Sequence, residues 1–152
     1  MRFTVAEEPY DGADGQRLVH AMAADMMARY HLTIADDPEP LEAEDFGVFV
    51  IARDPQGTAV GCAALRFLTS DTAELKRMYV VPEARGTGAA TAVIRTIEEL
   101  GRAHGTTIIT LVTGTAQPEA VRFYQREGYR PTDGFGALAG HPAAVFLARE
   151  LS

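Results

Sequence analysis

The sequence predicts an α/β fold of the α+β kind, in which a mixed, mostly antiparallel central sheet contains one parallel pair of strands. Three strand-like segments joined by short turns, Phe46–Ala52, Ala59–Leu68 and Ala73–Val81, predict an antiparallel meander. A helical pattern separates the third segment from a further strand, Thr106–Val112, and such a unit requires a right-handed crossover between parallel strands. The length of 152 residues suits a single domain over residues 1–152.

The segment before the meander is expected to supply a short strand, Phe3–Ala6, and one long helix. Apolar side chains recur in that helix at four-residue steps: Leu18, Met22, Met26 and Tyr30. Methionines here could line a ligand tunnel, but flexible thioether side chains more often fill a core, and we expect the core role. The acidic stretch His31–Asp45 is expected to form a loop with a helical turn around Leu41–Glu44.

Two helices and three strands are expected after the meander. Thr87–His104 carries one apolar stripe of helical period, and Thr106–Val112 is a β-branched run typical of a strand covered on both faces. Pro118 suits the first turn of a helix that runs through Glu127 and ends at Gly128. The last two strands begin at Tyr129 and cover Ala144–Arg149.

The composition narrows the class of partner. The net charge of −7 and the pI near 5.0 argue against nucleic acid and anionic membranes, which select basic surfaces. The same charge favours a neutral or cationic substrate, or it serves solubility alone. The single cysteine, Cys62, excludes an intrachain disulfide and a multi-cysteine metal site, so we expect a buried core residue and no metal. The N-terminal residues show no secretory pattern, and thirteen arginines with one lysine are typical of a GC-rich bacterial genome; we expect a cytoplasmic protein.

The segment Arg85–Ala90 has the features of a diphosphate cradle. It joins a strand to a helix, so free backbone N–H groups and the positive end of the helix dipole meet an anion there, and its small residues allow close approach. A P-loop would need Lys-Ser or Lys-Thr where Ala89-Ala90 stands. A dinucleotide fingerprint would need glycine or alanine at Thr91 and an acid in the next strand, and neither is present.

A third kind of diphosphate-binding loop matches this segment. The spacing Arg85-x-x-Gly88-x-Ala90 resembles the coenzyme A pyrophosphate motif of the GNAT superfamily of acyl-CoA N-acyltransferases. The segments Glu74–Val80 and Gln117–Tyr124, the latter followed by Glu127-Gly128-Tyr129, resemble two further motifs of that family in the same order. The resemblance implies a GNAT fold with helices on both faces of the sheet. It also implies that the parallel strands splay apart and admit acetyl-CoA, the expected co-substrate, between them.

The resemblance also implies which residues bind the coenzyme. Met78 and Val80 would offer backbone groups to the pantetheine arm, and Gln117 stands where the family usually has asparagine. The expected coenzyme-binding residues are Met78, Val80, Arg85, Gly86, Thr87, Gly88, Ala89, Ala90 and Gln117. Arg122 and Arg126 either meet the 3′-phosphate or form a solvated helix face.

Two residues are expected to carry the chemistry. By the resemblance, Tyr124 would protonate the leaving thiolate, and its alternative role is packing on the apolar face of its helix. Glu74 would deprotonate the amine, directly or through water, and its alternative roles are a solvated carboxylate at the start of the strand or an ion pair with Lys76 or Arg77. His141 and the acidic segment Asp36–Asp45 would border the acceptor side; for His141 an ordinary turn residue is the favoured alternative.

The sequence therefore predicts an N-acetyltransferase that moves an acetyl group from acetyl-CoA to an amine of a small molecule or peptide by direct attack. The alternative is an acyl-CoA-binding module or sensor without catalysis on the same fold. A nucleotide-binding α/β protein is disfavoured by the antiparallel meander. Exposed edge strands leave a homodimer open.

Overall fold

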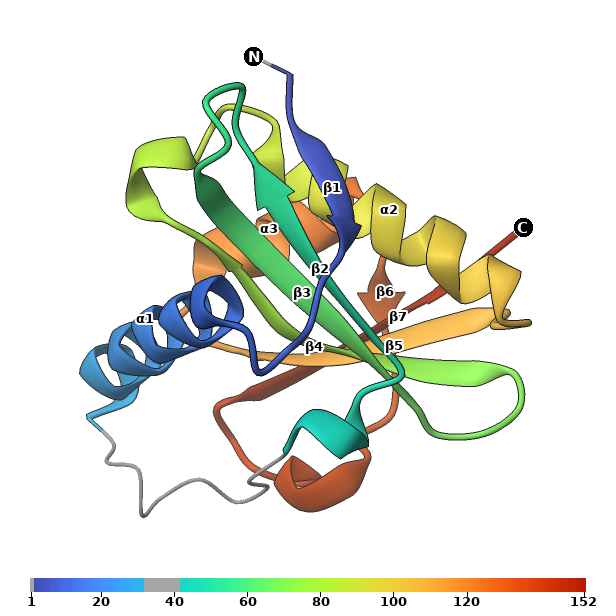
Figure 1. Cartoon of the computed structure of the whole chain (residues 1–152). Coiled ribbons are helices and arrows are strands. Elements are labelled where there is room, and N and C mark those ends of the chain that lie inside the picture. Colours follow the sequence, from blue (N-terminus) through green and yellow to red (C-terminus); the bar gives the residue numbers. More distant parts are fainter. Residues whose placement is uncertain (1, 32–41) are drawn as a thin grey trace.

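A computed structural model describes residues 2–31 and 42–152, and the architecture agrees with the predicted fold class (Figure 1). One seven-stranded sheet has the order β1-β2-β3-β4-β5-β7-β6, and only the β4–β5 pair is parallel. The strands are β1 (Thr4–Glu7), β2 (Val48–Arg53), β3 (Ala59–Phe67), β4 (Thr72–Val80), β5 (Ile108–Gly114), β6 (Arg130–Pro131) and β7 (Ala144–Glu150). The helices are α1 (Ala13–Tyr30), α2 (Ala89–Ala103) and α3 (Pro118–Arg126), with short 3₁₀ turns η2 (Ala43–Asp45), η3 (Pro82–Ala84) and η4 (Gly136–Leu138).

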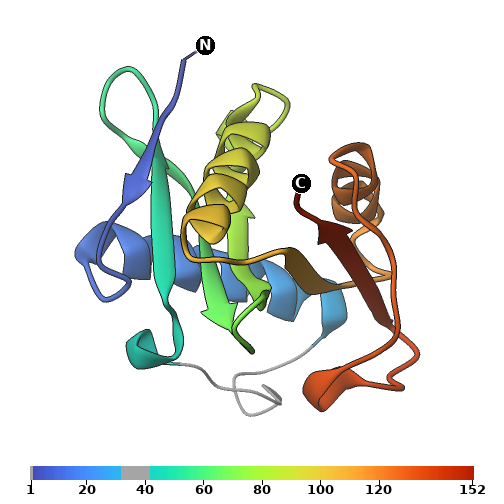
Figure 2. The same cartoon turned by 90° about the vertical axis from the view of Figure 1, so that its right-hand side faces the viewer.

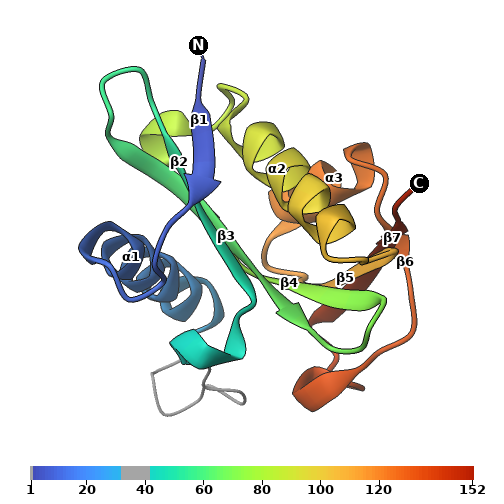
Figure 3. The same cartoon turned by 45° about the vertical axis from the view of Figure 1, so that its right-hand side comes forward.

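The two faces of the sheet are covered by different helices, as predicted (Figure 3). On one face, Leu18 of α1 is fully buried against a cluster that includes Ile51 and Cys62. On the other face, Val93 and Ile97 of α2 belong to a larger cluster. Its other members include these buried residues of the sheet and of the α3 region: Val48, Val50, Leu65, Leu75, Ile109, Leu111, Tyr124, Tyr129 and Leu147. Burial of apolar side chains on both faces, at about 25 cal/mol per Å², holds the layers together.

The parallel strands separate soon after they meet. β4 and β5 pair only through Thr72–Ile108, Ala73–Ile109 and Glu74–Thr110, and β5 then continues along β7. In Figure 2 the half of the sheet that carries β7 and α3 stands apart from the half that carries β1 and β2. The predicted splay is therefore present, and the part of β4 beyond Glu74 forms no ladder with β5.

A β-bulge interrupts β4 on its other side. Cys62 pairs with Tyr79 and Ala64 pairs with Lys76, so two residues of β4 lie opposite one residue of β3. The additional residue is Arg77 or Met78, and Arg77 has the left-handed φ of 56°. A bulge of this kind turns the strand and redirects its side chains.

Several predicted boundaries needed correction. α2 begins at Ala89 rather than Thr87, because Gly88 has a φ of 95° and is the N-cap. β5 begins at Ile108 rather than Thr106, because the Thr106 N–H closes the end of α2 on the Gly101 carbonyl. The expected turn around Leu41–Glu44 is η2, one to two residues later, and residue 41 lies outside the described residues.

Two predictions about sulfur-containing side chains had different outcomes. Cys62 is a fully buried core residue, as expected, and burial raises the pKa of its thiol to about 12. The expected core role of the methionines was wrong for Met22 and Met26, because both line the large cleft described below.

Candidate active site

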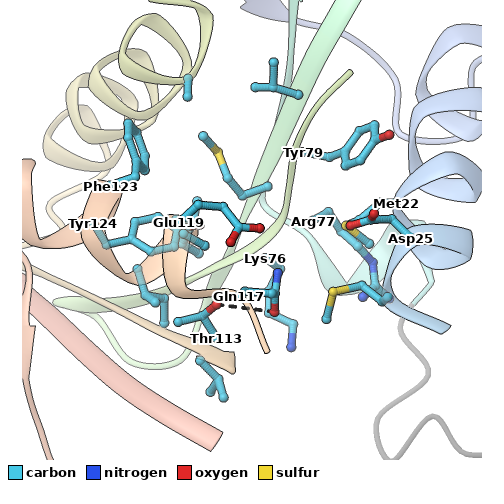
Figure 4. A pocket seen from close by; sticks show the side chains of 18 of the residues that line it. Met22, Asp25, Lys76, Arg77, Tyr79, Thr113, Gln117, Glu119, Phe123 and Tyr124 are labelled. Carbon is cyan, nitrogen blue, oxygen red and sulfur yellow. Dashed lines mark hydrogen bonds between the residues drawn. The ribbon is translucent and has the colours of Figure 1, made fainter. Parts of the chain in front are cut away.

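A cleft of about 1010 Å³ occupies the space where β4 and β5 part. In Figure 4, side chains of α3 form one wall and side chains of α1 form the facing wall, with β4 between them. The lining residues are Met22, Asp25, Met26, Arg29, Arg66, Leu68, Glu74–Val80, Ala84, Arg85, Gly86, Gly88, Ala90, Thr91, Leu111–Thr113, Gln117, Glu119, Ala120, Phe123, Tyr124, Arg126 and Phe135–Leu138. The cleft therefore reaches from the start of α2 through the sheet to α1.

One end of the cleft is the N-terminus of α2. Gly86 and Gly88 have φ values of 75° and 95°, and no side chain caps the helix. The Thr87 hydroxyl donates instead to the Ala84 carbonyl oxygen, and no acidic residue stands in the first turn. The first N–H groups of a helix have no partner within it, so this uncapped terminus can bind an anion.

The predicted coenzyme-binding loop divides into two groups. Arg85, Gly86, Gly88 and Ala90 line the cleft, whereas Thr87 and Ala89 do not. Ala89 is buried in the core, so only its backbone N–H is available to a ligand. The Arg85 Nε donates to the Val80 carbonyl at 3.0 Å, and its guanidinium lies 5.7 Å from the Tyr79 ring centroid. These contacts hold a positive charge beside the helix terminus.

The free edge of β4 forms the floor of the cleft. Met78 and Val80 lie beyond the last β4–β5 pair, so their backbone groups on this edge face the opening rather than β5. An extended ligand can add to such an edge through main-chain hydrogen bonds. The edge leads from the uncapped terminus of α2 towards Glu74.

Tyr124 lines the cleft on its α3 side. Its ring is 7% exposed and makes edge contacts with Phe123 and Tyr129, at centroid distances of 5.4 and 5.8 Å. Its hydroxyl has no hydrogen-bond partner among the described residues, yet the side chain lines the cleft. Burial raises the pKa of Tyr124 above the ordinary value for tyrosine, so the hydroxyl stays protonated and can act as a donor.

Glu74 lies at the point where the strands part. Its side chain is buried, and its Oε2 lies 3.5 Å from Nζ of Lys76, the ion pair that the sequence left open as its alternative role. Arg66 of β3 is directly opposite it in the register. Glu74, Lys76 and Arg66 share the α1 side of the sheet, so the carboxylate faces the half of the cleft away from α2.

Gln117, the N-cap residue of α3, connects the two walls. Its Oε1 accepts a hydrogen bond from the hydroxyl of Tyr30 at 3.1 Å, and a second one from the hydroxyl of Thr113 at 3.4 Å, which lies beside it in Figure 4. Arg29 supports the same connection, because its Nη1 donates to the Ala116 carbonyl at 3.0 Å and pairs with Glu119. No sequence pattern singles out Arg29, and Tyr30 was expected only as part of the apolar stripe of its helix.

The remaining residues that the sequence proposed for the site lie partly inside and partly outside the cleft. Arg126 lines the cleft, whereas Arg122 does not. His141 is exposed outside the cleft, and its Nδ1 accepts a hydrogen bond from the Ala143 N–H at 3.0 Å, which suits the turn role. Residues 36–41 of the acidic segment lie outside the described residues.

Residues 15–129 match the acetyltransferase (GNAT) family. The chain belongs to this family. Among GNAT relatives, an IAA acetyltransferase of Azospirillum brasilense is 34% identical over 104 residues, which are 68% of this chain and 67% of that protein. An N-acetyltransferase of Schizosaccharomyces pombe, uncharacterized by its name, is 33% identical over 107 residues, or 70% of this chain and 65% of that protein. The matched segments thus span about two thirds of the relatives' lengths.

Solved GNAT structures show the same fold. An acyl-CoA N-acyltransferase structure from Klebsiella pneumoniae has a TM-score of 0.84 and 26% identity, and it covers 99% of this chain and 98% of its own. A GNAT family acetyltransferase from Elizabethkingia anophelis with acetyl-CoA bound has a TM-score of 0.72 and 14% identity, over 98% of both chains. This likeness extends the fold assignment to nearly the whole chain.

Within residues 2–31 and 42–152, His, Cys, Asp and Glu form no group of three or more that could hold a metal ion. No helix in these same two ranges is long and apolar enough to cross a membrane.

Proposed function

We propose that this GNAT protein transfers the acetyl group of acetyl-CoA to the amine of a small molecule or peptide, by direct attack through a tetrahedral intermediate. The observation that supports it most is the continuity of one cleft, which joins the uncapped α2 terminus to Tyr124 and Glu74. The wider family membership supports acetyl transfer in general, and the roles of individual residues are part of the proposal.

In this proposal the coenzyme enters from the α2 side. Its diphosphate accepts hydrogen bonds from backbone N–H groups of the Arg85–Ala90 loop, and Arg85 adds charge. The pantetheine arm lies along Met78 and Val80 on the free edge of β4, and the Gln117 amide meets it from α3. The thioester then arrives near Tyr124.

The amine enters from the α1 side. Glu74 takes a proton from the ammonium group, directly or through water, and the amine nitrogen bonds to the thioester carbonyl carbon. The resulting oxyanion is stabilised by backbone N–H groups at the bulge of β4. Collapse re-forms the carbonyl and breaks the carbon–sulfur bond, and Tyr124 donates its proton to the thiolate. The second nitrogen proton then passes through water to the Tyr124 oxygen, so that the amide is neutral and Tyr124 is protonated again, and Glu74 releases its proton to solvent. The products are an N-acetyl compound and free coenzyme A.

A turnover assay tests the proposal and separates it from a binding module. Acetyl-CoA is mixed with a panel of amines, free thiol is followed with a chromogenic disulfide, and the acetylated product is identified by mass spectrometry. We expect amine-dependent thiol release and a mass increase of one acetyl group. Binding of acetyl-CoA by calorimetry without turnover on any amine would instead support the sensor alternative.

A further inference from the structure

The cationic side chains of this acidic chain gather in the cleft. The chain carries a net charge of −7, yet within residues 2–31 and 42–152 six arginine or lysine side chains and three carboxylates line the cleft. Arg85 and Arg126 lie towards the α2–α3 side, where the coenzyme phosphates are proposed to bind. The remaining positive charge faces the acceptor half. This arrangement favours an anionic group on the acceptor.

The three carboxylates already have cationic partners. Arg29 binds Asp25 through Nε at 3.0 Å and also pairs with Glu119. Lys76 lies 3.5 Å from Glu74. Arg77, by contrast, forms no ion pair within the described part of the chain. Its charge is the one that a ligand would neutralise.

Arg77 is held in an unusual position. Its φ of 56° is uncommon for a residue with a side chain, and such strain concentrates at functional sites. Its Nε donates to the Tyr10 hydroxyl at 3.4 Å, and its guanidinium lies 5.7 Å from the Phe46 ring centroid. The two Nη atoms make no hydrogen bond to the described residues. A half-buried, fixed guanidinium with two unused nitrogens matches the fork geometry of a carboxylate.

We propose that the acceptor is an amino acid with an apolar side chain, and that Arg77 binds its carboxylate while Glu74 faces its amine. Met22 of α1 lies on the same side of the cleft as Arg77 (Figure 4), and Met26, four residues further along α1, also lines the cleft; both suit the apolar side chain. This inference rests on the proposed acetyl transfer. The sequence left a neutral or a cationic acceptor open, and a zwitterionic amino acid is the neutral case.

The test compares acceptors that differ only at the carboxylate. L-leucine, L-leucinamide and 3-methylbutylamine are each assayed with acetyl-CoA, and the same three-member sets are built on methionine and phenylalanine. We expect kcat/KM for the amino acid to exceed that of its amide and of its decarboxylated amine by at least about tenfold. An acceptor without the carboxylate would leave the Arg77 guanidinium unpaired in the complex, and a site built for a charged group discriminates against such an analogue.

The variant Arg77→Asn removes the guanidinium, and asparagine tolerates the left-handed backbone, so the bulge is kept. We expect it to lose the preference for the carboxylate, mainly through KM, while the dissociation constant for acetyl-CoA by calorimetry stays within about twofold. Arg130→Asn is the matched control, since Arg130 is exposed on β6 and lies outside the cleft.

Three results overturn the inference. Equal use of amide and amino acid by the natural protein removes the need for a carboxylate, and a preference that survives Arg77→Asn assigns the carboxylate to another residue. In both of these cases the acetyl transfer itself stands. If no amine of any kind is acetylated although acetyl-CoA binds, the proposed function fails, and this inference fails with it.

Discussion

The Tyr30 hydroxyl donates a hydrogen bond to Oε1 of Gln117 at 3.1 Å, and so joins the last residue of α1 to the N-cap residue of α3 across the cleft. Gly114 makes this approach possible, because a Cβ at that position would lie 1.7 Å from the Tyr30 oxygen. The contact occupies the carbonyl end of the Gln117 amide. Its NH₂ group is then the end that can meet the coenzyme.

The first prediction is that Gly114→Ala breaks this connection. The added methyl group displaces the Tyr30 ring, so we expect a lower melting temperature and a weaker affinity for acetyl-CoA. Tyr30→Phe, which removes only the hydroxyl, should cost about 0.5–1.5 kcal/mol of stability. In a Tyr30→Ala background, Gly114→Ala should add little, and a double-mutant cycle by urea denaturation measures this coupling. Fully additive effects would show that Gly114 acts independently of Tyr30.

The distribution of these contacts explains what the sequence could predict. The Arg85–Ala90 loop and the start of α2 are local, so glycine, proline and helical spacing were sufficient to locate them within two residues. The hydrogen bond between Tyr30 and Gln117 joins residues 87 positions apart, and no local pattern encodes it. The left-handed Arg77 is also unpredictable, since arginine has no preference for positive φ and the register of β3 against β4 imposes it.

The second prediction tests the diphosphate loop. Gly88→Leu should raise the dissociation constant for acetyl-CoA by at least tenfold, a loss of about 1.4 kcal/mol, because the side chain blocks the helix terminus. Gly57→Leu is the matched control, since Gly57 has a φ of 85° and, like Gly88, has nothing within 4 Å of an added Cβ. Both variants carry the same kind of backbone strain, but Gly57 lies in the β2–β3 turn. Equal affinities by calorimetry would reject the assignment of the loop.

The third prediction concerns Glu74 as the base. Glu74→Gln keeps the shape of the buried side chain and removes its proton affinity, so turnover should fall and the acid limb of the pH–rate profile should flatten. Acetyl-CoA affinity should change little, because Glu74 faces the α1 side. An unaltered acid limb would mean that another group removes the proton. His141 would be a poor candidate for that role, given its position outside the cleft.

The fourth prediction concerns Tyr124. Tyr124→Phe should lower turnover by at least tenfold. General-acid groups usually contribute about 100- to 10,000-fold, and the effect is smaller where the thiolate leaves readily. The hydroxyl has no partner among the described residues, so the melting temperature and acetyl-CoA affinity should stay nearly constant. Because its pKa is raised, ionisation of Tyr124 should not produce the alkaline limb of the natural protein. A destabilised variant with full turnover would make Tyr124 a packing residue instead.

The last prediction concerns a buried polar network that joins α2, Tyr129 and β7, and it has a mutational test and a pH test. Glu98 is 2% exposed, accepts from the Tyr129 hydroxyl at 3.0 Å and is bound by Nη1 of Arg149 at 2.8 Å. Arg149→Met leaves the buried Glu98 carboxylate without its cation, so this variant should lower the free energy of unfolding by about 3 kcal/mol. The double variant with Glu98→Gln and Arg149→Met should recover much of that loss. Urea denaturation at pH 7 measures both.

The same network predicts a pH dependence of stability. Burial first, and then the neighbouring Glu98 carboxylate, raises the pKa of Tyr129 in the folded protein. The unfolded chain ionises this tyrosine near pH 10, so its contribution to folding is complete below that pH and declines as the pH rises further. Tyr129→Phe should therefore be less stable than the natural protein at pH 7, by about 1 kcal/mol for the lost hydrogen bond, and should lose less stability between about pH 9.5 and 11. If the two proteins lose stability in parallel over this range, ionisation of Tyr129 does not drive the alkaline transition, and the ionisation of another buried group such as Cys62 would account for it.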